Sequence, residues 1–380
     1  MAENKYKIAV SCASGVESVV KKELQRLGYF DTTAINGKIE VEGNDIDIAK
    51  LNICLRSADR VYIKLASFSA TAFDELFDGV YGIPFEEYID VNGRILVDGK
   101  CVKSKLFAVS ACQSIVKKAV VERLKDKKKI RLLREDGADY KIEFSVFKDV
   151  AEIYLNTSGT GLHKRGYRDL VGIAPIKETL ASALLLLSDV YYDKPFFDPF
   201  CGSGTLVIEG AKIALNIAPN KDRKFDFNFW KFFDKNAYNS ALNEAVDKER
   251  RDRKIDFSGS DVDGKAIKLA KHHAIKAGVS DYVSFSVKDV KDVKLEKRNG
   301  TIVSNPPYGE RVFDREQADV CYNELGRLKS ENPDWSFFVI TSAKNFEKKF
   351  GYKSERTRKL YNSNKECRFY YYYGNKKRDK

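Results

Sequence analysis

The stretch Phe196-Phe-Asp-Pro-Phe-Cys-Gly-Ser-Gly-Thr205 combines an apolar run, an acidic residue and a glycine-rich turn, and the helix-like pattern Thr205-Leu-Val-Ile-Glu209 follows it directly. This order predicts a strand, a loop and a helix. Small residues let a backbone approach a bound ligand closely, and a helix N-terminus offers unpaired N–H groups. We therefore expect a ligand at this turn. The pair Gly202 and Gly204 is too short for the dinucleotide fingerprint G-x-G-x-x-G, and an ordinary glycine turn is the alternative interpretation.

Residues 196 to 305 alternate between strand-like and helix-like patterns, which predicts a parallel sheet with helices on both faces. The strand-like sequence Thr301-Ile-Val-Ser304 leads into Asn305-Pro-Pro-Tyr308. In open α/β folds, ligands bind at the carboxyl edge of the sheet. We therefore expect the glycine turn and the Asn-Pro-Pro-Tyr loop to share this edge. A proline turn without function is the alternative for the second motif.

Together, these two motifs resemble the S-adenosylmethionine site and the catalytic loop of class I amino-methyltransferases. The segments Gly159-Thr-Gly-Leu-His-Lys-Arg-Gly-Tyr-Arg168 and Ala174-Pro-Ile-Lys-Glu-Thr-Leu180 narrow the resemblance to the RlmL-like family of THUMP-domain enzymes, which make N2-methylguanosine in large-subunit ribosomal RNA. The resemblance covers nearly the whole chain. It implies an α/β protein in which ferredoxin-like and THUMP modules precede a Rossmann-like class I methyltransferase domain, with S-adenosyl-L-methionine as the cofactor.

The chain of 380 residues exceeds what one hydrophobic core usually organises, so two or three domains are expected. Residues 1–66 show a βαββαβ pattern, for which a ferredoxin-like sandwich is the simplest closure. Residues 67–157 form a second α/β unit, which the resemblance identifies as the THUMP RNA-binding domain. We expect a helix at 110–124 in this unit, then a charged break at 125–129 and a hairpin at 140–155.

Residues 158–380 remain for the methyltransferase domain. An aromatic-rich insertion at about 217–253 separates its first strand and helix from the next strand. We expect these aromatic side chains to pack on the core, and the alternative is that they line the target pocket.

The composition is basic, with a formal net charge of +12 at pH 7. Such an excess suggests a polyanionic partner, usually nucleic acid, although a lysine-rich proteome would produce the same surface. The 7 cysteines include no C-x-x-C pair, so neither a zinc cluster nor a disulfide framework is indicated, and no metal is expected. The N-terminus lacks a signal-peptide core and no apolar stretch is long enough to span a bilayer, so we expect a soluble cytoplasmic protein.

The resemblance assigns the catalytic loop to Asn305, Pro306 and Tyr308. The Asn305 side-chain oxygen and the Pro306 carbonyl can accept the N–H bonds of an exocyclic amine and so help to localise its lone pair. The prolines stiffen the loop, and Tyr308 would stack on a flipped-out base. A separate strong base is unnecessary, because the cationic product can lose its proton after transfer. Cys201 lies in the glycine turn rather than in the catalytic loop, so we interpret it as a packing residue.

Several residues are expected to contact the cofactor. A carboxylate at a strand end can accept both ribose hydroxyls, which favours Asp261, whereas Asp263 is expected to cap the following helix. Asp289 is placed to accept the adenine amino group, and Val290 to make a backbone contact. In the resembling family the segment around Lys177 and Thr179 closes over the methyl donor. The full set of expected cofactor residues is Thr179, Asp198, Phe200, Gly202, Ser203, Gly204, Thr205, Asp261, Asp289, Val290 and Asn305.

Positive charge and ring faces follow the linker at 157–161. This composition suits phosphate contacts together with stacking on an unpaired base. The alternative is a domain-joining loop that Arg–carboxylate pairs hold in place. The expected RNA-binding residues are His163, Lys164, Arg165, Tyr167 and Arg168, together with Arg311 beyond the catalytic loop.

The sequence thus predicts transfer of a methyl group from S-adenosyl-L-methionine to N2 of a guanine in 23S ribosomal RNA, with free RNA or a ribosome assembly intermediate as partner. Because Asn-Pro-Pro-Tyr also serves adenine-N6 and cytosine-N4 chemistry on DNA, guanine comes from the resemblance alone. A transfer RNA guanine-N2 methyltransferase or a DNA amino-methyltransferase is the alternative enzyme. A non-catalytic RNA-binding or assembly protein is the alternative class.

Overall fold

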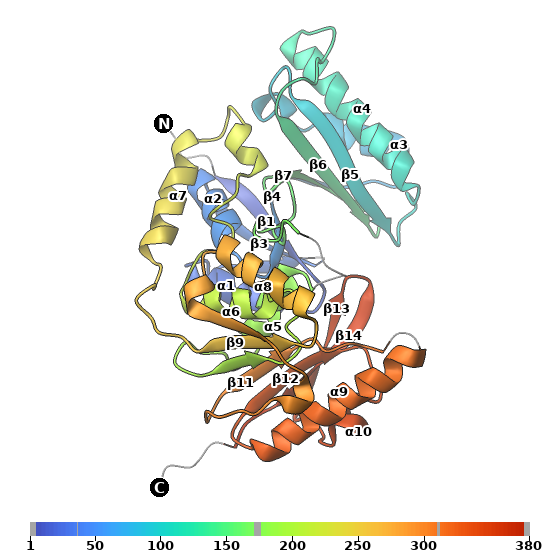
Figure 1. Cartoon of the computed structure of the whole chain (residues 1–380). Coiled ribbons are helices and arrows are strands. Elements are labelled where there is room, and N and C mark those ends of the chain that lie inside the picture. The colour runs from blue at the N-terminus through green and yellow to red at the C-terminus, as the bar shows by residue number, and fades with distance from the viewer. Residues whose placement is uncertain (1–4, 36, 171–175, 310–311, 376–380) are drawn as a thin grey trace.

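The computed structural model describes residues 5–35, 37–170, 176–309 and 312–375. Within these ranges the strands form two seven-stranded sheets, one in the N-terminal part of the chain and one in the C-terminal part (Figure 1). Also within these ranges, none of the helices has the length and apolar composition that a bilayer crossing requires.

The first module has the predicted order of elements: β1 (Tyr6–Cys12), α1 (Glu17–Arg26), β2 (Thr33–Ile35), β3 (Lys38–Gly43), α2 (Asp45–Cys54) and β4 (Ala58–Ser69). Its strands lie in the order β2-β3-β1-β4. Asn44 caps α2 through a capping box, in which its side chain accepts from the Asp47 N–H while the Asp47 carboxylate accepts from the Asn44 N–H. The ferredoxin-like expectation is confirmed.

The second module contains α3 (Phe73–Tyr81), η1 (Phe85–Glu87), β5 (Arg94–Val102), α4 (Val109–Lys128), β6 (Asp139–Phe147) and β7 (Val150–Asn156). Strand β4 pairs with β1 on one side and with β7 on the other, so the first two modules share one continuous sheet, and α3 and α4 lie beside its β5–β6 end (Figure 1). The predicted hairpin turns at Lys148 and Asp149, whose φ angles of 49° and 62° fit a tight hairpin turn.

Helix α4 is longer than the helix predicted for residues 110–124. It begins at Val109 without a side-chain cap and continues to Lys128, through the predicted charged break. Lysines are good helix formers, and cations in a last turn interact favourably with the helix dipole, so this run prolongs the helix.

The C-terminal sheet has the order β10-β9-β8-β11-β12-β14-β13. Its strands are β8 (Phe196–Asp198), β9 (Phe257–Asp261), β10 (Val283–Val287), β11 (Thr301–Ser304), β12 (Ser336–Thr341), β13 (Arg356–Asn362) and β14 (Lys365–Tyr372). The five strands from β10 to β12 are parallel, as predicted for residues 196–305, and β14 is antiparallel to both β12 and β13. Strands β9 and β10 follow β8 in the chain and lie on one side of it, whereas β11 lies on its other side. The topological switch point is therefore between β8 and β11.

Helices cover both faces of this sheet. They are α5 (Glu178–Leu186), α6 (Thr205–Ala214), α8 (Gly264–Lys276), α9 (Val312–Glu331) and α10 (Phe346–Phe350), with short 3-10 turns η3 (Ser280–Tyr282) and η4 (Val290–Asp292). Alternate residues of β12 enter two separate cores: Phe338 belongs to the core that contains Leu206 of α6, and Phe337 to the core that contains Tyr322 of α9. The prediction of helices on both faces is confirmed.

The insertion contains η2 (Asp226–Phe229) and α7 (Lys235–Asp247), and α7 packs against α2 of the first module. Trp230 stacks on Tyr140 of β6 with ring centroids 5.4 Å apart, and its Nε1 donates to the Asp139 carbonyl over 2.9 Å. Trp230, Phe225, Phe227 and Phe233 are buried, which confirms the packing expectation for these four, whereas Phe232 is half-buried and Phe229 is exposed. The insertion thus joins the catalytic domain to both N-terminal modules.

Candidate active site

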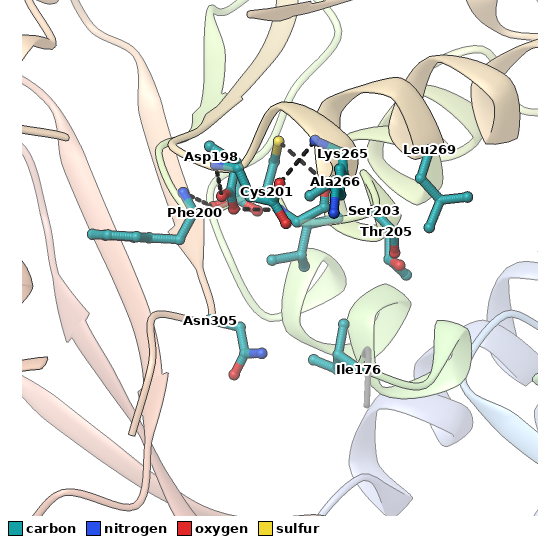
Figure 2. Close-up of a pocket in the computed structure, with 14 residues that line it drawn as sticks. Ile176, Asp198, Phe200, Cys201, Ser203, Thr205, Lys265, Ala266, Leu269 and Asn305 are labelled. Carbon is teal, nitrogen blue, oxygen red and sulfur yellow. Dashed lines mark hydrogen bonds between the residues drawn. The ribbon is translucent and has the colours of Figure 1, made fainter. Parts of the chain in front are cut away.

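A pocket of about 420 Å³ lies at the carboxyl ends of β8 and β9, beside the end of β11. Figure 2 shows the glycine turn and the start of α8 on one side of it, with Asn305 and Ile176 opposite. The glycine turn and the catalytic loop therefore share one edge, as predicted. The lining residues are Ile176, Asp198, Phe200, Cys201, Gly202, Ser203, Thr205, Leu206, Asp261, Asp263, Lys265, Ala266, Leu269 and Asn305.

Asp198 ends β8 and joins the two strands at the switch point. Its Oδ1 accepts from the Ser304 hydroxyl of β11 over 2.5 Å and from the Phe200 N–H over 3.1 Å. The side chain is almost fully buried, and this desolvation raises the pKa of Asp198 to about 7. The carboxylate therefore lies in an environment that a cationic or hydrogen-donating ligand would stabilise.

The glycine turn adopts a backbone that side chains disfavour, with φ of +50° at Gly202 and +83° at Gly204. A Cβ at Gly204 would lie 2.9 Å from the Phe285 ring and 3.0 Å from Ala270, whereas a Cβ at Gly202 would have no protein atom within 4 Å. Gly204 thus allows close packing of the turn, and Gly202 opens toward the pocket. Cys201 beside them is buried, and burial raises the pKa of its thiol, so the packing interpretation of Cys201 is confirmed and a thiolate nucleophile is disfavoured.

Asp261 ends β9 and closes the turn from the neighbouring strand. Its Oδ2 accepts from the Gly202 N–H and its Oδ1 from the Asp263 N–H, both over 2.9 Å. Each carboxylate oxygen retains a second lone pair, so ligand hydroxyls can still bind. Asp263 accepts from the Lys265 N–H over 2.8 Å, and its predicted role as the cap of α8 is confirmed.

Two buried hydroxyls line the pocket and lack a hydrogen-bond partner among the described residues: Ser203 Oγ and Thr205 Oγ1. Buried polar atoms are rarely left unsatisfied, so this arrangement fits a polar ligand. The hydroxyls lie at the N-terminus of α6, where a carboxylate is favoured. The open face at Gly202 adds room for close approach, and the donor set therefore fits S-adenosylmethionine.

Four expected cofactor residues are not among the residues that line this pocket in the described ranges: Thr179, Gly204, Asp289 and Val290. The Thr179 hydroxyl donates instead to Asp59 of β4 over 3.3 Å. Asp289 caps η4 by accepting from the Lys291 N–H over 3.1 Å, and Val290 is buried in the core beneath α9. Contacts of these residues with the cofactor stay predictions.

The catalytic loop is held from two sides. The Tyr308 hydroxyl donates to Asn305 Oδ1 over 2.6 Å and accepts from the Asn362 amide over 3.2 Å. The Tyr322 hydroxyl of α9 donates to the Pro307 carbonyl over 2.8 Å. Burial raises the pKa of Tyr308, so its hydroxyl stays protonated and acts as a donor. Pro306 is buried within the loop.

Three further residues support the site although the sequence motifs do not include them: Ser304, Asn362 and Tyr322. Ser304 could have been found, because it is the residue before the Asn-Pro-Pro-Tyr loop and lies beside Asp198 across two neighbouring strands. Asn362 and Tyr322 come from β13 and α9, and no local motif marks either residue.

Two expected RNA-binding residues belong to the interior instead. Arg165 is 3% exposed, and its Nε lies 3.6 Å from Glu209 Oε1 of α6. Its guanidinium also donates to the Leu162 and Arg56 carbonyls and to Asn220 Oδ1. The Tyr167 hydroxyl donates to the same carboxylate over 3.1 Å. Stacking and phosphate binding require exposed side chains, so the structure contradicts the RNA-contact expectation for these two residues and supports the alternative of a pinned joining loop.

The remaining expected RNA contacts differ in their exposure. Lys164 is exposed, and Arg168 is half-buried with an ion pair to Glu178 of 3.2 Å. His163 is half-buried, and burial together with the nearby Lys177 lowers its pKa to about 4, so the ring is neutral near neutral pH. Arg311 lies outside the described residues.

The fold and the pocket together define the class of protein. The sheet order, the antiparallel β14, the glycine turn after β8, the acid after β9 and Asn-Pro-Pro-Tyr after β11 are the features of a Rossmann-like, S-adenosylmethionine-dependent methyltransferase.

The chain belongs to the RMKL-like methyltransferase family, whose domain model matches residues 165–370. Models of the RlmL ferredoxin-like domain and of the THUMP domain match residues 7–62 and 70–156. The protein is therefore an S-adenosylmethionine-dependent RNA methyltransferase of this family, with a THUMP RNA-binding domain.

Two relatives illustrate the range of similarity. The chain is 43% identical over 371 residues to the protein named "Putative RNA methyltransferase YpsC" of Bacillus subtilis (strain 168), with 97% of this chain and 96% of that protein covered. It is 32% identical over 366 residues to ribosomal RNA large subunit methyltransferase K/L of Psychromonas ingrahamii. That match covers 94% of this chain but 49% of the relative, so the chain spans about half of the K/L protein.

Solved structures agree in fold along the whole chain. The structure of SMU.472 complexed with SAH has a TM-score of 0.92 and 41% identity, with 99% of this chain and 100% of that chain covered. The structure described as a predicted N6-adenine-specific DNA methylase from Listeria monocytogenes has a TM-score of 0.93 and 43% identity, with 98% and 97% covered. The overall arrangement in Figure 1 is thus shared with these proteins.

Proposed function

We propose that this protein transfers the methyl group of S-adenosyl-L-methionine to the exocyclic N2 of a guanine in 23S ribosomal RNA. The observation that carries the proposal is the position of Asn305, whose amide lines the cofactor pocket while Tyr308 holds its oxygen. The THUMP domain and the name of the K/L relative support ribosomal RNA as the substrate. The resemblance of the sequence motifs to the RlmL-like family supports guanine as the target base.

The cofactor supplies an electrophilic methyl group, and the residues of the loop prepare the amine. Asn305 Oδ1 and the Pro306 carbonyl accept the two N–H bonds of the target amine, which keeps its lone pair out of the ring system. Asn305 can accept this bond in addition to that of Tyr308, because an amide oxygen has two lone pairs. The hydrogen bonds of Tyr308 and Tyr322 fix the acceptors before the base arrives, so little reorganisation is needed.

The glycine turn provides the cofactor contacts in this proposal. Ser203 and Thr205 bind the carboxylate end at the N-terminus of α6, and Asp261 accepts the ribose hydroxyls at the end of β9. Asp289 and Val290 follow β10 and serve the adenine ring. Asp198 stabilises the cationic part of the ligand from the buried switch point.

A methyl-transfer assay tests the proposal. Wild-type protein, Asn305→Ala and the control Asn243→Ala are incubated with tritiated S-adenosylmethionine and with ribosomal or transfer RNA from cells that lack the protein. Asn243 lies on the exposed face of α7, away from the pocket. Nucleoside analysis then identifies the product.

Labelled N2-methylguanosine in 23S RNA, lost in Asn305→Ala and kept in Asn243→Ala, is the expected result. Label in transfer RNA alone would keep the mechanism and replace the substrate. Cofactor binding without transfer to either RNA would indicate the assembly-protein alternative, a partly assembled particle as substrate, or DNA, which a parallel reaction with unmethylated DNA distinguishes.

A further inference from the structure

A second pocket, of about 660 Å³, lies beyond the catalytic loop. Asn305 lines the cofactor pocket, whereas Tyr308 and Gly309 line the second pocket. The Tyr308 hydroxyl is hydrogen-bonded to Asn305 Oδ1 over 2.6 Å. The two pockets therefore lie on either side of the catalytic loop, next to each other. The second pocket therefore lies close to the point where a target base would contact Asn305.

Three cationic side chains from three elements converge on the second pocket: Arg315 of α9, Lys344 of the segment after β12, and Lys365 of β14. One carboxylate also lines it, that of Asp319, but Lys349 binds this group at 2.8 Å and Asn345 donates to it over 3.0 Å. Among the described lining residues, the three cationic side chains outnumber this one carboxylate, and such a pocket favours phosphate groups.

The position of this pocket relative to the catalytic loop is fixed. The Tyr322 hydroxyl in its floor bonds both the Pro307 carbonyl, over 2.8 Å, and Thr341 Oγ1, over 3.1 Å. Gly309 packs so closely on α9 that a Cβ there would lie 2.8 Å from the Arg315 backbone. Helix α9, which carries Arg315, is therefore held directly against the catalytic loop.

Lys365 connects the pocket directly to the expected stacking residue. Its ammonium lies 5.5 Å from the centroid of the Tyr308 ring. The cation and the ring that the sequence predicts to stack on the base therefore lie side by side, close enough to contact the same nucleotide.

We propose that the pocket lined by Arg315, Lys344 and Lys365 binds the RNA phosphodiester backbone next to the target nucleotide. The inference rests on the proposed function, because it assumes that the target base reaches Asn305. Its role is to hold the strand in register once the base has left its stack. Phosphate contacts contribute affinity and position but no choice of base, so these residues act on the affinity for RNA.

The test compares the full-length wild type with Lys344→Ala, Lys344→Ala/Lys365→Ala and the charge-preserving variant Lys344→Arg. Lys254→Ala is the matched control, because Lys254 precedes β9 and lies at the opposite edge of the sheet from the site. Binding of labelled 23S RNA in the presence of S-adenosylhomocysteine is measured over a range of salt concentrations. Binding of labelled S-adenosylmethionine to each variant reports whether the cofactor pocket is intact.

We expect the slope of log affinity against log salt to fall by about 0.7 for each single-strand phosphate that a lysine no longer neutralises. Lys344→Ala should reduce the slope by one such step and the double variant by two, whereas Lys344→Arg and Lys254→Ala should match the wild type. Cofactor binding should be unchanged in all of them.

Wild-type slopes in both alanine variants would overturn the pocket assignment, as would a fall in RNA affinity that occurs only together with a fall in cofactor binding. A change in the methylated base without a change in RNA affinity would also contradict it. Failure of the wild type to form N2-methylguanosine, with the slopes still reduced in the variants, would reject the proposed function and retain the phosphate site.

Discussion

The hydroxyl of Tyr308 donates a hydrogen bond of 2.6 Å to the side-chain oxygen of Asn305. This bond sets the orientation of the amide and leaves one lone pair of the oxygen for the target amine. Asn362 in turn donates to the Tyr308 hydroxyl, so the β13–β14 hairpin supports the catalytic loop. A tyrosine expected to act through its ring therefore also acts through its hydroxyl.

Replacement of Tyr308 by phenylalanine separates these two actions. Tyr308→Phe keeps the ring but loses both hydrogen bonds of the hydroxyl, the one it donates to Asn305 and the one it accepts from Asn362. We therefore expect kcat to fall by about tenfold, equivalent to about 1.4 kcal/mol, while KM for RNA stays constant. Tyr308→Ala also loses base stacking, worth about 1–3 kcal/mol, and should raise KM for RNA as well. Steady-state methyl transfer measures both constants. Equal KM values in the two variants would contradict the stacking role.

The two glycines of the turn should respond differently to alanine. Gly204→Ala places a Cβ against Phe285 and Ala270 at a φ of +83°, so both stability and cofactor binding should fall. Gly202→Ala meets no protein atom within 4 Å, so its cost in stability should be limited to the strain of a side chain at a φ of +50°, about 1–2 kcal/mol. Its cofactor affinity should fall at least tenfold, a loss of about 1.4 kcal/mol. Thermal unfolding without ligand and calorimetric titration with S-adenosylhomocysteine measure the two effects. A cofactor affinity of wild-type strength in Gly202→Ala would show that the ligand does not approach this backbone.

Adjacent residues of the joining loop provide a matched pair for stability and RNA binding. Arg165→Ala leaves the buried Glu209 carboxylate without its closest cation, so the unfolding free energy should fall by about 3–5 kcal/mol. Lys164→Ala removes an exposed charge and should change stability by about 0.5 kcal/mol or less, while it weakens RNA binding. Urea denaturation and filter binding of RNA separate the two effects. The assignment would be wrong if Arg165→Ala unfolded like the wild type and bound RNA more weakly.

Asp198 should make the stability of the cofactor-free protein depend on pH. Desolvation raises its pKa in the folded state to about 7 from an ordinary value of 3.8. Between these values the folded state binds the proton more tightly than the unfolded state, so the contribution of this group to stability falls as pH rises toward 7. Asp198→Asn cannot titrate, and its advantage in unfolding free energy over the wild type should grow between about pH 4 and about pH 7 and then level off. A difference that stays constant over this range would show that Asp198 is ionised throughout.

Local patterns in the sequence identified the elements that carry the site. The glycine turn, the acid Asp261 and the Asn-Pro-Pro-Tyr loop each lie at the carboxyl end of a short strand, and parallel strands bring such ends to one edge of a sheet. The four parallel strands within residues 196–305 and the order of the ferredoxin-like module followed from the same periodicity. These features depend on residues close together in the chain.

Features that depend on long-range packing were not predictable. Arg165 and Tyr167 lie in a strongly basic segment of the sequence. Only the fold shows that both are buried and that both contact Glu209, which is 44 and 42 positions further along the chain. Most side chains of β13 are exposed or only partly buried, so its sequence shows little alternation between apolar and polar residues. This strand was therefore not predicted, and neither was the hydrogen bond from its Asn362 to Tyr308. The shared sheet of the first two modules depends on β4, whose second half pairs with a strand more than eighty residues further along the chain.

The central claim is that Asn305 presents the exocyclic amine of a guanine in 23S RNA to the cofactor. Mass spectrometry of nucleosides from 23S RNA tests it directly, in cells that lack the protein and carry either the wild-type gene, Asn305→Ala or no copy. We predict that N2-methylguanosine at one position is present with the wild type and absent in both other strains. An unchanged content of N2-methylguanosine in 23S RNA across the three strains would contradict the claim.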